Sequence, residues 1–235
     1  MDYQKLFDQF YIESSDIPDF PSKKVEELCK KLPPYSRDLA GMIYLIPFGE
    51  NLSDTEIAYA KVLSLLSLSA FIHGDLEKNI AFNDKEAVLY GDYLFALSFS
   101  LIPSDISAEE AKEFLTMTYH FSEKRLSHLA EDLSEEDMIL FAKEDYGTPL
   151  RRTARKSAEK QNTDSGIKKD YEAFAEAIGI CWGILCEGYS ISPHPYLKEA
   201  KDAANKLPMK QKLEPIIHLL KGAAIEHDQN ITKTS

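Results

Sequence analysis

The chain has 235 residues, of which 44% are hydrophobic, so it can bury one substantial core. Its formal net charge of −12 argues against a general affinity for nucleic acid or anionic lipid, because both polyanions would be repelled. We expect a single domain over residues 1–227 and a disordered tail over residues 228–235, because the C-terminal stretch is polar.

Helix signals recur from one end of the chain to the other. Three pairs of residues fit the capping box that opens a helix, namely Ser53 with Glu56, Asn83 with Glu86 and Ser107 with Glu110. No stretch alternates apolar and polar residues between hairpin turns, so strands have no support. The predicted helices cover residues 4–14, 22–32, 36–47, 54–73, 84–102, 107–132, 134–146, 149–161, 168–188, 195–206 and 209–226. The sequence therefore predicts an all-α fold.

Several local features refine this prediction. The segment QNTDSG, residues 161–166, is predicted to be a loop, and Pro215 is expected to shorten or kink the last helix. The three cysteines form no CxxC pair, and we expect them to be reduced and structural. The N-terminal residues lack the pattern of a signal peptide, which favours the cytoplasm. The apolar run over residues 87–102 is too short to span a bilayer comfortably, so we expect no membrane span.

The apolar segment EAVLYGDYLFALSFSLI carries an unusual pair, Gly91 and Asp92, in what is predicted to be a buried helix. Glycine is a poor helix former and an unpaired buried carboxylate is costly. The part AVLYGDYLFA closely resembles the AVLxGDYLxxxA segment of the trans-polyprenyl diphosphate synthases, which elongate allylic diphosphates with isopentenyl diphosphate. We therefore interpret the pair as structural. Gly91 would let a neighbouring helix approach closely, and Asp92 would be hydrogen-bonded rather than exposed.

Four further segments extend the resemblance over about residues 35–222. They are SAFIHGDLEK (69–78), RRTARKSAEK (151–160), IGICWGILCEG (178–188) and YLKEAKDAANKLP (196–208). In order, they resemble the first aspartate-rich motif, the KTA segment, the second aspartate-rich motif and the C-terminal helix of the family. The resemblance implies an isoprenoid-synthase-like bundle of about ten or more helices around a central cavity.

The first aspartate-rich motif is degenerate. In the family, its aspartates hold magnesium against the substrate diphosphate, whereas here Gly74 and Lys78 replace two of them. Asp75 and Glu77 are the acids that are left. Because Mg²⁺ is held by carboxylates in octahedral geometry, and a lysine within one turn competes for Asp75, cation binding should be weak.

The second motif is also degenerate, because Cys186 and Ser190 replace aspartates and only Glu187 is left. The arginine-rich segments that bind diphosphate in the family are missing too, apart from Arg37 near the N-terminus. We therefore predict no metal and no cofactor, with magnesium bound only if a residual or partner-assisted site exists. The acids that are left, Asp75, Glu77 and Glu187, are too few for us to assign a catalytic residue.

A basic cluster on the predicted helix 149–161 offers the candidate diphosphate ligands Arg151, Arg152 and Arg155. By the resemblance, Arg152 takes the place of the lysine that contacts diphosphate in the KTA segment. A solvated basic face that balances nearby acids explains the cluster equally well. Both interpretations stay open at this point.

The pattern is similar to the non-catalytic small subunit of heterodimeric long-chain prenyl synthases, heptaprenyl diphosphate synthase component I. The resemblance implies a pseudoenzyme that acts as a regulatory subunit in isoprenoid chain elongation. It would form a homodimer, or a heterodimer with a catalytic chain, through residues 87–133. One alternative is a weak prenyltransferase that uses Asp75, Glu77, Arg152 and Glu187 to bind a prenyl diphosphate. The other is a helical protein that binds a lipid or a partner.

Overall fold

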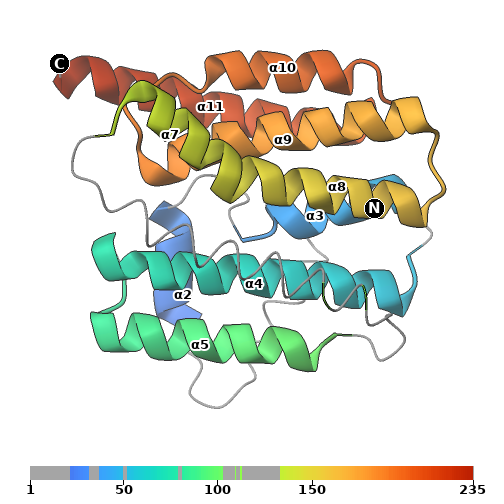
Figure 1. Cartoon of the computed structure of the whole chain (residues 1–235). Coiled ribbons are helices and arrows are strands. Elements are labelled where there is room, and N and C mark those ends of the chain that lie inside the picture. Colours follow the sequence, from blue (N-terminus) through green and yellow to red (C-terminus); the bar gives the residue numbers. More distant parts are fainter. Residues whose placement is uncertain are drawn as a thin grey trace. The chain divides into compact units, whose positions relative to one another are not determined.

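The computed structural model describes residues 22–31, 37–49, 52–78, 81–102, 109, 112 and 133–234 (Figure 1). Within these residues every regular element is a helix and no strand occurs, so the predicted all-α fold is confirmed. The predicted helices 4–14 and 107–132 lie outside the described residues or almost entirely so. The chain divides into two compact units, residues 1–106 and 107–235. A single domain over residues 1–227 stays a prediction.

The helices of the first unit begin and end close to the predicted positions. They are α2 (Ser22–Lys31), α3 (Leu39–Leu45), the short 3₁₀ helix η1 (Ile46–Phe48), α4 (Asp54–Lys78) and α5 (Asp84–Ser100). The helices of the second unit are α7 (Glu135–Ala142), the π-helical turn η3 (Lys143–Gly147), α8 (Thr148–Lys160), α9 (Ser165–Glu187), α10 (His194–Ala204) and α11 (Lys210–Thr234).

Two of the predicted capping boxes open the long helices of the first unit. The Asn83 side chain accepts a hydrogen bond from the Glu86 amide at 3.0 Å, and Glu86 accepts one from the Asn83 amide at 3.2 Å. At the start of α4, Glu56 accepts from the Ser53 amide at 3.1 Å. Glu86 also pairs with Lys24 of α2, and this hydrogen bond lowers the pKa of the Glu86 carboxyl. The first turn of α5 is thus joined to α2.

Helices α4 and α5 lie side by side (Figure 1), and Gly91 lies where α5 meets His73 of α4. A Cβ atom at Gly91 would come within 2.3 Å of the His73 ring, and Ser69 of α4 donates a buried hydrogen bond to the Gly91 carbonyl at 2.8 Å. Asp92 Oδ1 lies 3.1 Å from His73 Nε2, yet the Asp92 side chain is 70% exposed. The expectation that Asp92 is hydrogen-bonded is therefore confirmed, whereas the expectation that it is not exposed is wrong. Asp92 lies at the edge of the contact between α4 and α5, where it reaches His73 and also faces solvent.

Within the described residues, one stretch is long and apolar enough to cross a bilayer by length and composition, Asp54–Gly74 of α4. The sequence analysis considered only the shorter run in α5 and so missed it. Of its most apolar window, 56% is buried in the structure. Core helices of water-soluble proteins meet the same criteria, and α4 contacts both α3 and α5, so we interpret it as a core helix.

The second unit is organised around α9, which contacts α7, η3, α8, α10 and α11 (Figure 1). The sequence predicted separate helices at 134–146 and 149–161, but α7, η3 and α8 follow one another without a break. Pro149 in the first turn of α8 has no amide to continue an α-helical ladder. The backbone hydrogen bonds instead continue through the wider π-helical turn of η3. Pro149 therefore does not interrupt the continuous rod that α7, η3 and α8 form.

Two glycines of α9 allow the rod of α7, η3 and α8 to pack very closely against this helix. A Cβ atom at Gly179 would lie 2.6 Å from the Tyr146 carbonyl oxygen and 2.7 Å from the Gly147 Cα. One at Gly183 would lie 2.6 Å from the Tyr146 ring. Because real Cβ atoms do not approach other atoms this closely, glycine is required at both positions for this packing.

Helix α9 starts three residues earlier than predicted. The Asp164 side chain caps it, accepting hydrogen bonds from the amides of Gly166 at 2.8 Å and Ile167 at 3.4 Å. The predicted loop at residues 161–166 is therefore present but ends at Asp164. The sequence signal was an acidic N-cap, Asp164, directly before Ser165 and Gly166, which the polar composition of the segment masked.

The C-terminal segment that was expected to be disordered is helical. Helix α11 starts five residues before Pro215, is not shortened by it, and continues to the penultimate residue. His227 Nε2 lies 2.9 Å from the Tyr189 carbonyl oxygen, and Asp228 accepts a hydrogen bond from the Ser192 hydroxyl at 3.1 Å. These contacts with the segment between α9 and α10 hold a polar stretch that composition alone would leave unstructured.

Cys181 and Cys186 are buried on α9, and no cysteine of the described residues forms a disulfide. Burial raises the pKa of the Cys181 thiol to about 12. Cys181 is therefore a neutral core side chain at physiological pH.

The glycine contacts predict opposite effects for alanine at different helical glycines. Gly179→Ala should lower the free energy of unfolding by about 1–3 kcal/mol, because its new methyl group meets backbone atoms that cannot move aside. Gly222→Ala, in the exposed interior of α11 with nothing within 4 Å, should raise it by about 0.5–1 kcal/mol. Urea unfolding followed by circular dichroism measures both. Equal effects at the two positions would contradict the close packing of η3 on α9.

Candidate functional site

The carboxyl end of α9 carries the segment that resembles the second aspartate-rich motif. Cys186 is buried and Glu187 is half-buried, and the helix ends at Glu187. Gly188 adopts a left-handed conformation with φ of 68°, which terminates the helix. Ser190 therefore lies beyond the helix, exposed, with its hydroxyl 3.9 Å from the Met138 sulfur. The family motif needs acids one and four residues apart on one helix, and α9 does not extend far enough to present them.

Glu187 already has a partner. Its carboxylate accepts a hydrogen bond from the Tyr146 hydroxyl of η3. The Tyr146 ring packs edge-on against Trp182, with centroids 5.2 Å apart and an interplanar angle of 84°. Gly183 leaves the space that the ring fills. The Tyr146 side chain, which binds Glu187, is thus held in place by the π-helical turn and by Trp182, in the space that Gly183 leaves.

The residues present here do not fit a magnesium ion. Mg²⁺ demands oxygen ligands in octahedral geometry, usually including one or two carboxylates. The end of α9 offers one carboxylate that is engaged by a hydroxyl, a buried thiol and a serine off the helix. Throughout the part of the chain that the structure describes, no three His, Cys, Asp or Glu side chains are grouped so that they could hold a metal.

The three candidate arginines of α8 have different surroundings. Arg151 Nη1 lies 3.6 Å from Glu176 Oε1 on α9, and Arg155 Nε donates to Glu159 at 3.0 Å. Among the described residues, no ion pair or hydrogen bond involves Arg152, which is half-buried. Arg151 and Arg155 thus lie beside carboxylates of the same unit, which Lys143 and Lys168 share, whereas Arg152 has no such partner among the described residues.

The segment that resembles the first aspartate-rich motif lies at the C-terminal end of α4. Asp75 and Glu77 belong to the helix, but their side chains lie outside the described residues. Directly before them, His73 contacts Gly91 and Asp92 of α5, and Gly74 is buried. The structure therefore brings together His73, Gly91 and Asp92, but it does not describe where the carboxylates of Asp75 and Glu77 point.

Sequence reasoning identified Glu187 but missed Tyr146. The two residues are 41 positions apart in the chain, so no local pattern joins them. The one available signal was the spacing of Gly179 and Gly183, which leaves a groove one turn long on one face of α9. A bulky side chain from another helix had to fill that groove.

Comparison with known proteins adds a structural likeness. No protein-family model matches the chain, and no curated protein matches it. A geranyltransferase from Legionella pneumophila aligns with 97% of this chain and 96% of its own length, with 14% identity and a TM-score of 0.65. A geranyltranstransferase from Methanosarcina mazei aligns with 97% of this chain and 89% of its own, with 19% identity and a TM-score of 0.61.

A third similar structure is the small subunit of geranyl diphosphate synthase from Antirrhinum majus. It aligns with 93% of this chain and 100% of its own length, with 14% identity and a TM-score of 0.61. All three alignments cover most of both chains at TM-scores above 0.6. The chain therefore has the all-α fold of the prenyl diphosphate synthases.

Proposed function

We propose that this chain is a non-catalytic member of the trans-polyprenyl diphosphate synthase family, acting in the cytoplasm as a subunit or regulator of isoprenoid chain elongation. The observation that carries the proposal is the end of α9. There the one surviving acid of the second motif, Glu187, is bonded to Tyr146, and the helix stops before Ser190.

Ionising an allylic diphosphate requires cations that stabilise the charge of the leaving group. A catalytic member of this family would gather those cations with acids on two helices. On α9 the chain supplies one engaged carboxylate, and on α8 two of the three candidate arginines are paired with Glu159 and Glu176. These features support a chain that keeps the fold without the electrostatic environment that the reaction needs.

The surface of α5 supports a role in assembly. Val88, Leu89 and Tyr93 are 42%, 56% and 40% exposed, and Leu89 and Tyr93, four residues apart, share one helical face. Exposed apolar side chains that gather on one face mark interaction surfaces. The likeness to the geranyl diphosphate synthase small subunit agrees with this role. We infer a homodimer, or a heterodimer with a catalytic synthase chain, that uses residues 87–133, of which most of 103–132 lie outside the described residues.

One observation favours the alternative of a weak prenyltransferase. The Arg152 guanidinium has no ion pair within the described residues, so it could receive a diphosphate. Such an enzyme would use Asp75, Glu77 and Glu187 as well as Arg152. This alternative and the proposal differ in what the purified chain does alone.

The first prediction of the proposal concerns turnover. The purified chain, incubated with allylic diphosphates, isopentenyl diphosphate and magnesium, should release no elongated product, because the end of α9 lacks the ligands for the metal. Added to an active prenyl diphosphate synthase from the same cell, it should change the rate or the chain length of the product. Product analysis by radiolabel and chromatography measures both. Turnover by the chain alone, lost in the Arg152→Ala variant, would establish the weak-enzyme alternative instead.

The second prediction distinguishes a structural Glu187 from a catalytic one. Tyr146→Phe and Glu187→Gln should each lower the free energy of unfolding, and the double variant should show a coupling of about 1 kcal/mol or more. Urea unfolding of the four proteins provides this cycle. Magnesium affinity, measured by titration calorimetry, should be equally weak in all four. A fall in magnesium affinity in Glu187→Gln, without coupling to Tyr146, would show that the carboxylate serves a metal.

The third prediction tests assembly through α5. Light scattering at micromolar concentration should give a mass of about twice 26.6 kDa, or a complex with a catalytic synthase chain. Leu89→Glu should weaken that association, because it places a charge in an apolar interface. Leu140→Glu is the matched control, since Leu140 is a similarly exposed leucine, on α7. A stable 26.6 kDa monomer that binds no synthase chain would contradict the subunit proposal.

A further inference from the structure

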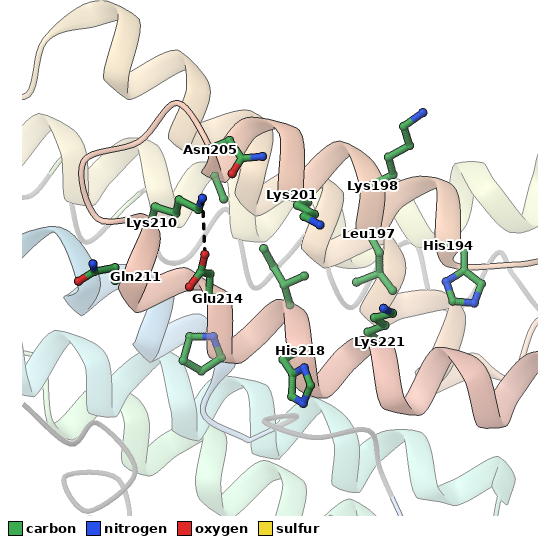
Figure 2. A pocket seen from close by; sticks show the side chains of 13 residues that line it. His194, Leu197, Lys198, Lys201, Asn205, Lys210, Gln211, Glu214, His218 and Lys221 are labelled. Carbon is green, nitrogen blue, oxygen red and sulfur yellow. Dashed lines mark ion pairs between the residues drawn. The ribbon is translucent and has the colours of Figure 1, made fainter.

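Helices α10 and α11 enclose a groove that the proposed function does not use. Its volume is about 700 Å³, and it lies wholly within the second unit (Figure 2). The lining residues of α10 run from His194 to Asn205, and those of α11 run from Lys210 to Lys221. On each helix they recur every three or four positions, so each helix contributes one continuous face to the groove.

The size of the groove fits a helix better than a compact ligand. The lining face from His194 to Asn205 rises by about 16 Å at 1.5 Å per residue, which is about three helical turns. Half of a cylinder that is 16 Å long and about 10 Å across has a volume of about 600 Å³. This is close to the volume of the groove, so it could hold a helix sunk to about half of its depth.

The groove has an apolar floor. Leu197 and Ala204 of α10 and Ile217 of α11 lie along it, and Pro215 adds an apolar ring. Figure 2 shows the Leu197 side chain between the two helices. Because this surface is concave, it does not match a flat lipid bilayer, whereas the apolar ridge of an amphipathic helix would fill it.

Three lysines around the groove have no counter-charge. Lys198, Lys201 and Lys221 form no ion pair within the described part of the chain, and all three are exposed. Lys201 lies on α10 and Lys221 on α11, while Lys198 extends away from α11 (Figure 2). Lys210 differs from them, because its ammonium lies 3.6 Å from Glu214.

This concentration of positive charge stands out in a chain whose net charge is −12. His194 at one end of the groove is matched by Asp228 at 3.3 Å, so the surplus lies at the three lysines. Like charges around one groove repel each other, and an acidic partner would remove that repulsion. The charge and the apolar floor together select an occupant that has both an apolar ridge and acidic flanks.

We propose that the groove between α10 and α11 is a docking site for an amphipathic helix of a partner protein, with apolar residues on one face and Asp or Glu on its flanks. Its apolar ridge lies against Leu197 and Ile217, and its acids pair with Lys201 and Lys221. The inference rests on the groove alone and holds whether or not the chain is catalytic.

The test uses the full chain and a defined probe. The probe is a fluorescein-labelled helical peptide of about 14 residues, held by a lactam link, with leucines on one face and glutamates on both flanks. Fluorescence anisotropy should give a Kd in the micromolar range. The variant with Lys201→Glu and Lys221→Glu should bind at least about tenfold more weakly, and binding should weaken with added salt.

Matched controls separate docking from general attraction. Lys212→Glu with Lys169→Glu makes the same change in charge outside the groove, and it should leave the Kd within about twofold. A peptide with alanine in place of every leucine should lose at least tenfold, because the apolar floor then has no partner. Circular dichroism verifies that the variants fold, and Lys201→Gln with Lys221→Gln replaces the charge-reversed pair if they do not.

Three results would overturn the proposal. One is binding that is equally weakened by the control charge reversals, and another is equal affinity for the alanine peptide, since both indicate unspecific attraction of an anion. The third is absence of peptide binding together with binding of the chain to anionic lipid vesicles that the Lys201 and Lys221 changes abolish. That result would assign the same lysines to a membrane surface.

Discussion

The second unit depends on one steric constraint, which is that α9 must accept the backbone of another helix at a distance that no side chain permits. Gly179 and Gly183 meet this constraint by presenting only backbone to η3. The close approach places Tyr146 over α9, and from there its hydroxyl reaches Glu187. The packing at Gly179 and Gly183, several residues away, therefore determines whether the Glu187 carboxylate is engaged. An acid that could serve a metal becomes part of the interface between two helices.

Local features were predicted well from the sequence. The caps at Ser53 and Asn83 involve residues three apart, and the all-α fold follows from repeated short-range patterns. Gly91 could be interpreted because glycine in an apolar helix demands a reason, and the contact with His73 supplies one. Such features depend on a few neighbouring residues, so a sequence can show them directly.

Features that depend on distant residues were not predicted. The bond from Tyr146 to Glu187 and the contacts that hold the C-terminal end of α11 join residues far apart in the chain. Composition alone predicted disorder there, since it counts polar side chains without knowing their partners. The pairing of Arg151 with Glu176 is a similar case. A row of arginines does not show which of its members are already neutralised by another helix.

The π-helical turn η3 helps both α7 and α8, which it joins, to keep contact with α9. Ala142 of α7 and Leu150 of α8 are both buried, and both helices contact α9. In an uninterrupted α-helix these two residues would point about 80° apart, since each residue turns the helix by about 100°. A π turn takes up one additional residue, which reduces the offset to about 20°. The extra residue thus brings the buried sides of two successive helices into line, so that both can face α9.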